Sequence, residues 1–179
     1  SSSSTESEEG SGALTVTGTG TAGQFTTGTA SSSISSTGTT AIVATALADG
    51  QTLTTTGNGA LTITGLQANL AVNDARSAAH SVTAAAVANL TVAMGTSTSG
   101  TDTIVATALT DGQVLTLTGS NSTNLSFANG DITASAFAGA LAVTGSGTTG
   151  QFTTGVASSS ISSTGATTIV ATAMADDQT

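Results

Sequence analysis

The chain alternates between apolar and hydroxyl-bearing residues over many short stretches. Leu14–Thr17 reads Leu-Thr-Val-Thr, and the same order of apolar residue and Thr returns in Leu61–Thr64 and Leu115–Thr118. A period of two places the apolar side chains on one face of an extended strand and the Thr side chains on the other. Glycine follows each of these stretches and favours a turn there. The pattern therefore predicts short, half-buried β-strands separated by glycine-containing turns.

The chain also repeats itself. Leu14–Thr52 returns near the end as Leu141–Thr179, with 31 of 39 positions identical, and Ile104–Gly119 is a shorter echo of Ile42–Gly57. Repetition of this kind indicates stacked copies of one structural unit. The second copy ends at Thr179 inside a unit, so we expect either a longer repetitive protein or a subunit with open ends.

The spacing of the apolar residues predicts an all-β fold. In the first half the same kind of position recurs at a constant spacing, as from Leu14 to Ile42 and from Phe25 to Leu53. We interpret this as a β-solenoid, similar to a parallel β-helix, with three short strands in each coil of about 28 residues. Tandem β-sandwich repeats are the alternative, because their strands are also short and bounded by glycine.

Two segments depart from the repetitive β region, which we assign to residues 14–179. Residues 1–13 are rich in Ser and Glu and have only one apolar residue, Ala13, which is typical of a solvated arm or linker. Asn73–Leu90 is rich in Ala and contains the only Arg and the only His. We interpret it as a strand with a loop, although a short helix capped by Asn73 or Asp74 is compatible with the same sequence.

Composition excludes several classes of partner. The chain has ten acidic residues against a single Lys or Arg, a net charge of −9, and charged residues make up only 6 %. A nucleic-acid-binding protein needs cations to displace counterions, so we exclude nucleic acid as a partner. The chain has no uninterrupted apolar stretch long enough to cross a bilayer, so we expect no transmembrane segment.

The acidic residues are candidates for calcium binding. Asp49-Gly50, Asp111-Gly112 and Asn129-Gly130-Asp131 are also common turn sequences, and turn formation alone would explain them. Calcium needs six to eight converging oxygens, which carboxylates, hydroxyls and carbonyls of the turns would have to supply. The candidate ligands are Asp49, Asp102, Asp111, Asp131, Asp176 and Asp177. No other cofactor is expected.

Other residues carry weaker chemical signals. Asp74, Arg76 and His80 are close in sequence, but catalysis would need a nucleophile and a base oriented by a third group, and Ser is too common here to identify one. We therefore predict no catalytic site and no enzyme activity. The four Phe residues, of which Phe25 and Phe152 are equivalent in the repeat, are expected in the core rather than on a sugar-binding surface.

Pairs of Thr separated by one residue are typical of the flat threonine rows of ice-binding solenoids. Thr on the solvent face of any strand gives the same pattern, and the pairs do not recur in every unit. The pairs are Thr15/Thr17, Thr54/Thr56, Thr62/Thr64 and Thr116/Thr118.

The absence of Cys, the near-absence of basic residues and units such as LTVTG and IVATALADGQ resemble bacterial secreted β-strand-repeat proteins. These include repetitive surface-layer proteins and giant adhesins exported by type I secretion. The resemblance implies a β-solenoid at the cell surface and calcium-dependent assembly. The calcium-binding nonapeptide GGxGxDxUx of that class is absent here, so its ligands have no counterparts in this chain.

We therefore expect an extracellular structural protein that assembles with itself, as a subunit or segment of a surface layer, filament or adhesin stalk. The alternative is an ice-binding or glycan-binding module on the same scaffold, with a cell-surface glycan as the partner in the second case.

Overall fold

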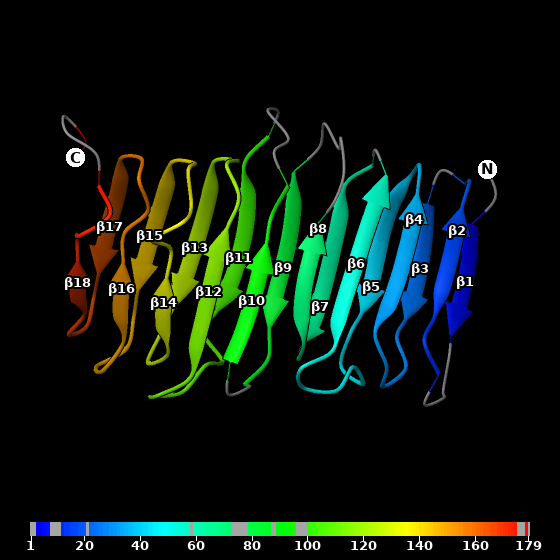
Figure 1. The fold of residues 1–179 in the computed structure, drawn as a ribbon, viewed down its shortest axis with the longest axis horizontal. Coiled ribbons are helices and arrows are strands. Elements are labelled where there is room, and N and C mark those ends of the chain that lie inside the picture. The colour runs from blue at the N-terminus through cyan, green and yellow to red at the C-terminus, as the bar shows by residue number, and fades with distance from the viewer. Residues whose placement is uncertain are drawn as a thin grey trace.

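The computed structural model describes residues 3–7, 12–20, 22–57, 59–72, 79–86, 89–95, 100–174 and 178. Over these residues the chain forms eighteen short strands and no helix. The strands lie side by side in two layers along one long axis, with the two termini at its opposite ends (Figure 1).

The odd-numbered strands form one nine-stranded sheet, called sheet A here, and the even-numbered strands form another, called sheet B. Sheet A contains β1 (Ser3–Ser7), β3 (Ala22–Thr26), β5 (Thr39–Val43), β7 (Leu61–Leu66), β9 (His80–Ala84), β11 (Asp102–Ala106), β13 (Thr123–Phe127), β15 (Leu141–Gly145) and β17 (Ser159–Ser163). Sheet B contains β2 (Thr15–Gly18), β4 (Ser32–Ser36), β6 (Thr52–Gly57), β8 (Asn69–Val72), β10 (Asn89–Ala93), β12 (Val114–Thr118), β14 (Asp131–Thr133), β16 (Gln151–Thr153) and β18 (Thr168–Val170).

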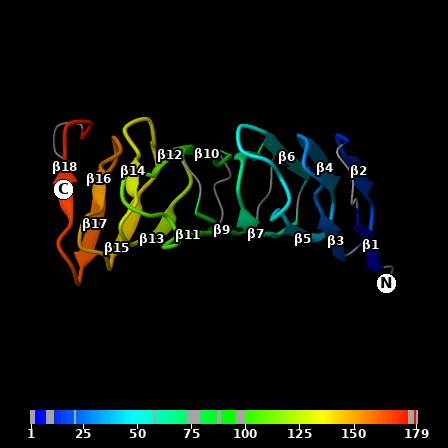
Figure 2. The ribbon, with the colours of Figure 1, turned by 90° about the horizontal axis from the view of Figure 1, so that it is seen from below.

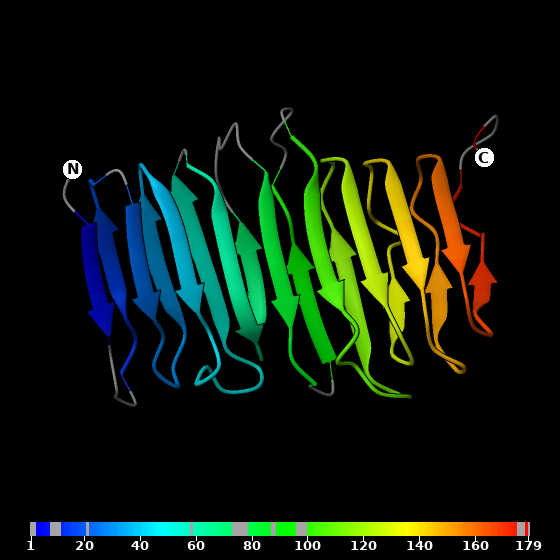
Figure 3. The ribbon, with the colours of Figure 1, turned by 180° about the vertical axis from the view of Figure 1, so that it is seen from behind.

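The chain alternates between the two sheets at every turn, so each coil consists of one strand from sheet A and one from sheet B. Figure 2 shows the two sheets as separate layers, and Figure 3 shows the opposite face. Neighbouring strands within each sheet are parallel, as between β3 and β5 and between β10 and β12. This confirms the predicted β-solenoid and excludes the sandwich alternative, whose sheets are antiparallel.

The prediction of three strands in each coil is wrong, and so is the coil length derived from it. Each coil uses two strands, and residues that face each other in successive coils are closer in sequence than predicted, as for Leu53 and Leu70 or Asn89 and Val114. The predicted spacing, from Leu14 just before β2 to Ile42 in β5, does span three strands. Because a coil uses only two, that spacing is one and a half coils and connects positions on opposite sheets.

Alternate side chains of both sheets point into a narrow interior. β13 shows the pattern clearly: Thr123, Leu125 and Phe127 are buried, whereas Asn124 is exposed. All four Phe side chains are buried, as predicted, and the rings of Phe127 and Phe152 lie 6.3 Å apart, centroid to centroid. Burying such a side chain stabilises the fold by about 1.5–3 kcal/mol, so this row of stacked apolar residues is the main source of stability.

The two copies of the long repeat occupy opposite sheets. Val16 lies in β2 of sheet B, whereas its counterpart Val143 lies in β15 of sheet A. The step from β2 to β15 is an odd number of strands, which exchanges the sheets. Local contacts survive the exchange: Ser31 donates from its backbone nitrogen and its hydroxyl to Gln51 Oε1, at 3.0 and 2.9 Å. Ser158 makes the same two bonds to Gln178, at 2.9 and 2.7 Å.

The two atypical segments are partly described. In the N-terminal arm, Ser3–Ser7 form β1 and pair in parallel with β3, so this part of the predicted arm belongs to sheet A. In the Ala-rich segment, His80–Ala84 form β9 and Asn89 begins β10, which agrees with the interpretation as strand rather than helix over these residues. Positions 73–78, including Asp74 and Arg76, lie outside the described residues.

Candidate functional site

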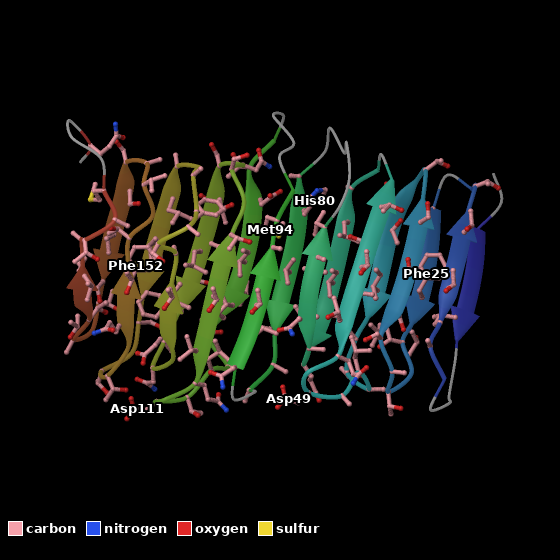
Figure 4. All side chains as sticks on the ribbon, in the orientation of Figure 1. Phe25, Asp49, His80, Met94, Asp111 and Phe152 are labelled. Atoms are coloured by element: carbon pink, nitrogen blue, oxygen red, sulfur yellow. The ribbon has the colours of Figure 1, made fainter. Side chains whose placement is uncertain are left out.

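Two acidic turns lie along one long edge of the solenoid, where the chain passes from sheet A to sheet B. Asp49 connects β5 to β6 and Asp111 connects β11 to β12, and both side chains are exposed (Figure 4). Each is followed by a glycine with a φ of 77°, which closes the turn. The same edge carries Asp131 at the start of β14, where its Oδ1 accepts a hydrogen bond of 3.0 Å from the Gln151 backbone nitrogen.

These acids do not converge on one point. β5 and β11 are separated by three strand spacings in sheet A, which corresponds to about 14 Å along the axis. A calcium ion holds its ligands at about 2.3–2.6 Å, so Asp49 and Asp111 belong to separate sites if either binds an ion. Among the residues that the structure describes, no three acidic or His side chains are grouped to hold a metal. Asp176 and Asp177 lie outside the described residues.

Asp102 has a different environment from the other candidate ligands. Its side chain is 1 % exposed and lies in the interior at the start of β11, and its Oδ1 accepts a hydrogen bond of 2.9 Å from the backbone nitrogen of His80 in the preceding coil. His80 is itself 2 % exposed. A buried carboxylate is costly unless it is hydrogen-bonded, so this contact between coils compensates part of the desolvation of Asp102.

The interior column that contains His80 and Asp102 is more polar than its surroundings. Asp102 faces Thr123 in the next coil, and Leu61 and Leu141 bracket the polar residues on either side. The hydroxyl of Thr123 donates to the carbonyl of Asn121 at 3.1 Å. A substrate in solution has no access to residues buried to this degree, so the arrangement favours a structural role for His80 over the catalytic one.

The outer face of sheet A carries neutral and mostly short side chains. One column of outward residues runs in register across eight strands, from β3 to β17. Its members are Gln24, Ala41, Thr62, Ser81, Thr103, Asn124, Ala142 and Ser160. We call the surface of strands β3–β17 around this column face A. Over its described residues, face A has no charged side chain pointing outward.

Face A is hollowed near its C-terminal end. An open hollow of about 410 Å³ is bordered by Ser122, Asn124, Ala142 and Ser160, and a second of about 210 Å³ lies beside it. Asn124 and Ala142 line both. Ala142 occupies the position at which the first copy of the repeat has Thr15, so a smaller side chain is present where the hollow opens. The lining of the larger hollow offers Ser and Thr hydroxyls, one amide, and apolar groups from Ala140, Leu141 and Ala142, and no charge.

The outer face of sheet B carries a row of threonines. Thr91, Thr116, Thr133 and Thr153 face one another on the adjacent strands β10, β12, β14 and β16. Only Thr116 belongs to the Thr pairs identified in the sequence. The other three stand outside those pairs, so their alignment depends on a register that no spacing in the chain reveals.

The comparisons with known proteins give no family for this chain. No family model matches it, and neither the curated proteins nor the solved structures contain a match. In the part of the chain that is described, no helix is long and apolar enough to cross a membrane.

Proposed function

We propose that the chain is an extracellular structural protein, a self-assembling subunit or segment of a surface layer, filament or adhesin stalk. The observation that carries this proposal is the exchange of sheets between the two copies of the repeat. A sequence that occupies either sheet, as Val16 and Val143 illustrate, can be continued along the axis without a new design. A chain that can be lengthened in this way suits a structural protein that has to be long and rigid.

The distribution of charge supports assembly of a particular kind. The acids Asp49, Asp111 and Asp131 lie along one edge, whereas face A is neutral over its described residues. Two copies that approach edge to edge would bring like charges together, and a divalent cation would reduce that repulsion. We therefore keep calcium as the candidate cofactor of the assembly, bound between acidic edges rather than inside one chain.

An extracellular location is consistent with the composition. The chain has no Cys and a single Lys or Arg residue, Arg76, so trypsin would find one cleavage site. Together with the resemblance to secreted repeat proteins, this supports a protein that persists in an exposed environment.

Sedimentation of the purified chain over a wide concentration range, with calcium and with chelator, tests the proposal. Association that increases with concentration is the expected result, and electron microscopy of the native material would then show fibres or a lattice rather than isolated particles. A chain that remained monomeric at high concentration under both conditions would refute self-assembly.

Ice binding is a second candidate, favoured by the threonine row Thr91, Thr116, Thr133 and Thr153. The strand spacing of about 4.8 Å gives a regular array of hydroxyl and methyl groups. Thermal hysteresis that is lost in Thr133→Arg, and kept in Thr103→Arg on the opposite sheet, would establish this function. Wild-type protein without any thermal hysteresis would exclude it.

A cell-surface glycan is the remaining candidate partner. All four Phe side chains are buried, so a sugar could not stack on them and would bind through hydroxyl and amide groups such as Asn124. Binding to a glycan array by the folded chain would support this partner.

A further inference from the structure

We infer that face A is the surface through which two copies of the chain associate, each contributing its own face A to a two-fold symmetric contact. The inference rests on the proposed self-assembly and specifies which surface starts it. It depends on charge, area and shape, and each of these can be read from described residues.

Charge selects face A among the surfaces of the solenoid. Each chain carries a net charge of −9, so close approach is favourable only where no acidic side chain is brought against another. Asp49 and Asp111 lie on the edge, and Asp131, at the start of β14 on that same edge, has its side chain on the outer side of sheet B. Face A is the long surface on which the described residues leave no carboxylate to be desolvated.

The area of face A is sufficient for a specific contact. Eight strands at a spacing of about 4.8 Å and about five residues at roughly 3.3 Å give a flat surface on the order of 650 Å². A standard interface uses about 800 Å² from each partner, and the roughness of the side chains adds to the flat value. Face A of a second copy therefore covers the area that a stable dimer needs.

The shape of face A also favours close packing. Its side chains are short, and Ala142 and Asn124 border hollows into which side chains of the opposite copy can enter. Val43 and Val105 project from the same face and are partly buried in the single chain, so an interface would remove more of their apolar surface from water. In a symmetric contact each copy offers both the projections and the hollows.

The repeat provides a matched pair of variants for the test. Ala142 on face A and Thr15 on the outer face of sheet B are equivalent positions of the two copies, and both are exposed. Ala142→Glu and Thr15→Glu therefore add the same charge to the same local sequence on opposite faces. Thr62→Glu, in β7, places a charge on face A far from Ala142 in β15 and serves as an independent second variant.

Sedimentation velocity and circular dichroism of the complete chain distinguish the outcomes. We expect the wild type and Thr15→Glu to reach twice the monomer mass, and Ala142→Glu and Thr62→Glu to stay monomeric at tenfold higher concentration with an unchanged β-sheet spectrum. Dimerisation of both face A variants like the wild type would overturn the inference while leaving self-assembly intact. Loss of dimerisation in Thr15→Glu as well would also overturn it, because the contact would then involve both sheets. A monomeric wild type would instead refute the proposed function itself.

Discussion

The repeat allows the effect of burial on stability to be measured with sequence held nearly constant. Ile42 and Ile169 are equivalent residues of the two copies, but the Ile42 side chain is 1 % exposed and that of Ile169 is 49 % exposed. Ile42 has Phe25 and Ile63 as in-register neighbours on both sides, whereas Ile169 pairs with Phe152 on one side. We therefore compare Ile42→Ala with Ile169→Ala.

The expected losses follow from the carbon atoms that each change removes. Ile→Ala deletes three carbons, worth about 2.4 kcal/mol of transfer free energy when all are buried. At Ile42 the two neighbouring coils prevent collapse, so a cavity cost adds to this and the total loss is about 3–4 kcal/mol. At Ile169 about half of the transfer term applies and the site is open to solvent, so we expect at most about 1.2 kcal/mol.

Thermal and urea unfolding followed by circular dichroism would measure the difference. For a chain of this size a loss of about 1 kcal/mol shifts Tm by about 2–4 °C, so Ile42→Ala should lower Tm by roughly 10 °C and Ile169→Ala by at most about 5 °C. Val is a milder control at both positions. Equal losses for the two Ala variants would refute the reasoning. Burial would then not determine how much an interior Ile contributes to the free energy of unfolding.

Three further changes test particular contacts. Asp102→Ala removes the acceptor for the buried His80 backbone nitrogen and should lower the free energy of unfolding by about 1–3 kcal/mol in urea titrations, whereas Asp102→Asn retains an oxygen and should lose less. Gly119→Ala, at a φ of 131° and with the added Cβ against the Met94 carbonyl, should unfold at a lower temperature than Gly112→Ala, whose φ is 77° and whose surroundings are open. In electron micrographs, the native assembly should withstand concentrated sodium chloride but lose lateral contacts in chelator at low salt; dissolution by sodium chloride alone, with no effect of chelator, would contradict the calcium bridge between acidic edges.

The fold could be predicted from the sequence because it follows from a simple alternation of apolar and hydroxyl-bearing residues. Leu14–Thr17 alternates with a period of two, which is enough to predict a half-buried strand, and the repeat is enough to predict stacked coils. The length of one coil could not be predicted in the same way. Spacing along the chain counts the strands between Leu14 and Ile42, but not how many strands close one coil, because closure depends on the turns and on packing across the interior.

For the candidate site, too, the sequence predicted some features and only the structure revealed others. The turn positions of Asp49 and Asp111 follow from the glycines after them and were predicted. The burial of Asp102 was not, because Asp102-Thr103 reads like an exposed loop end and only the register with β9 and β13 places its carboxylate inside. The hollow beside Asn124 and Ala142 likewise depends on strands that are adjacent in sheet A and distant in sequence.

The sequence alone thus determined that this chain forms short strands, that they stack as an array, and that few charges are available, because these properties depend on residue type and local period. The tertiary structure decided which residues meet across coils. It placed the two copies of the repeat on opposite sheets, aligned Thr91 with Thr116, Thr133 and Thr153, and left the described part of face A neutral. The physical reason is that parallel strands pair between coils of unequal length, so register is set by the closing of each turn and by the shared core.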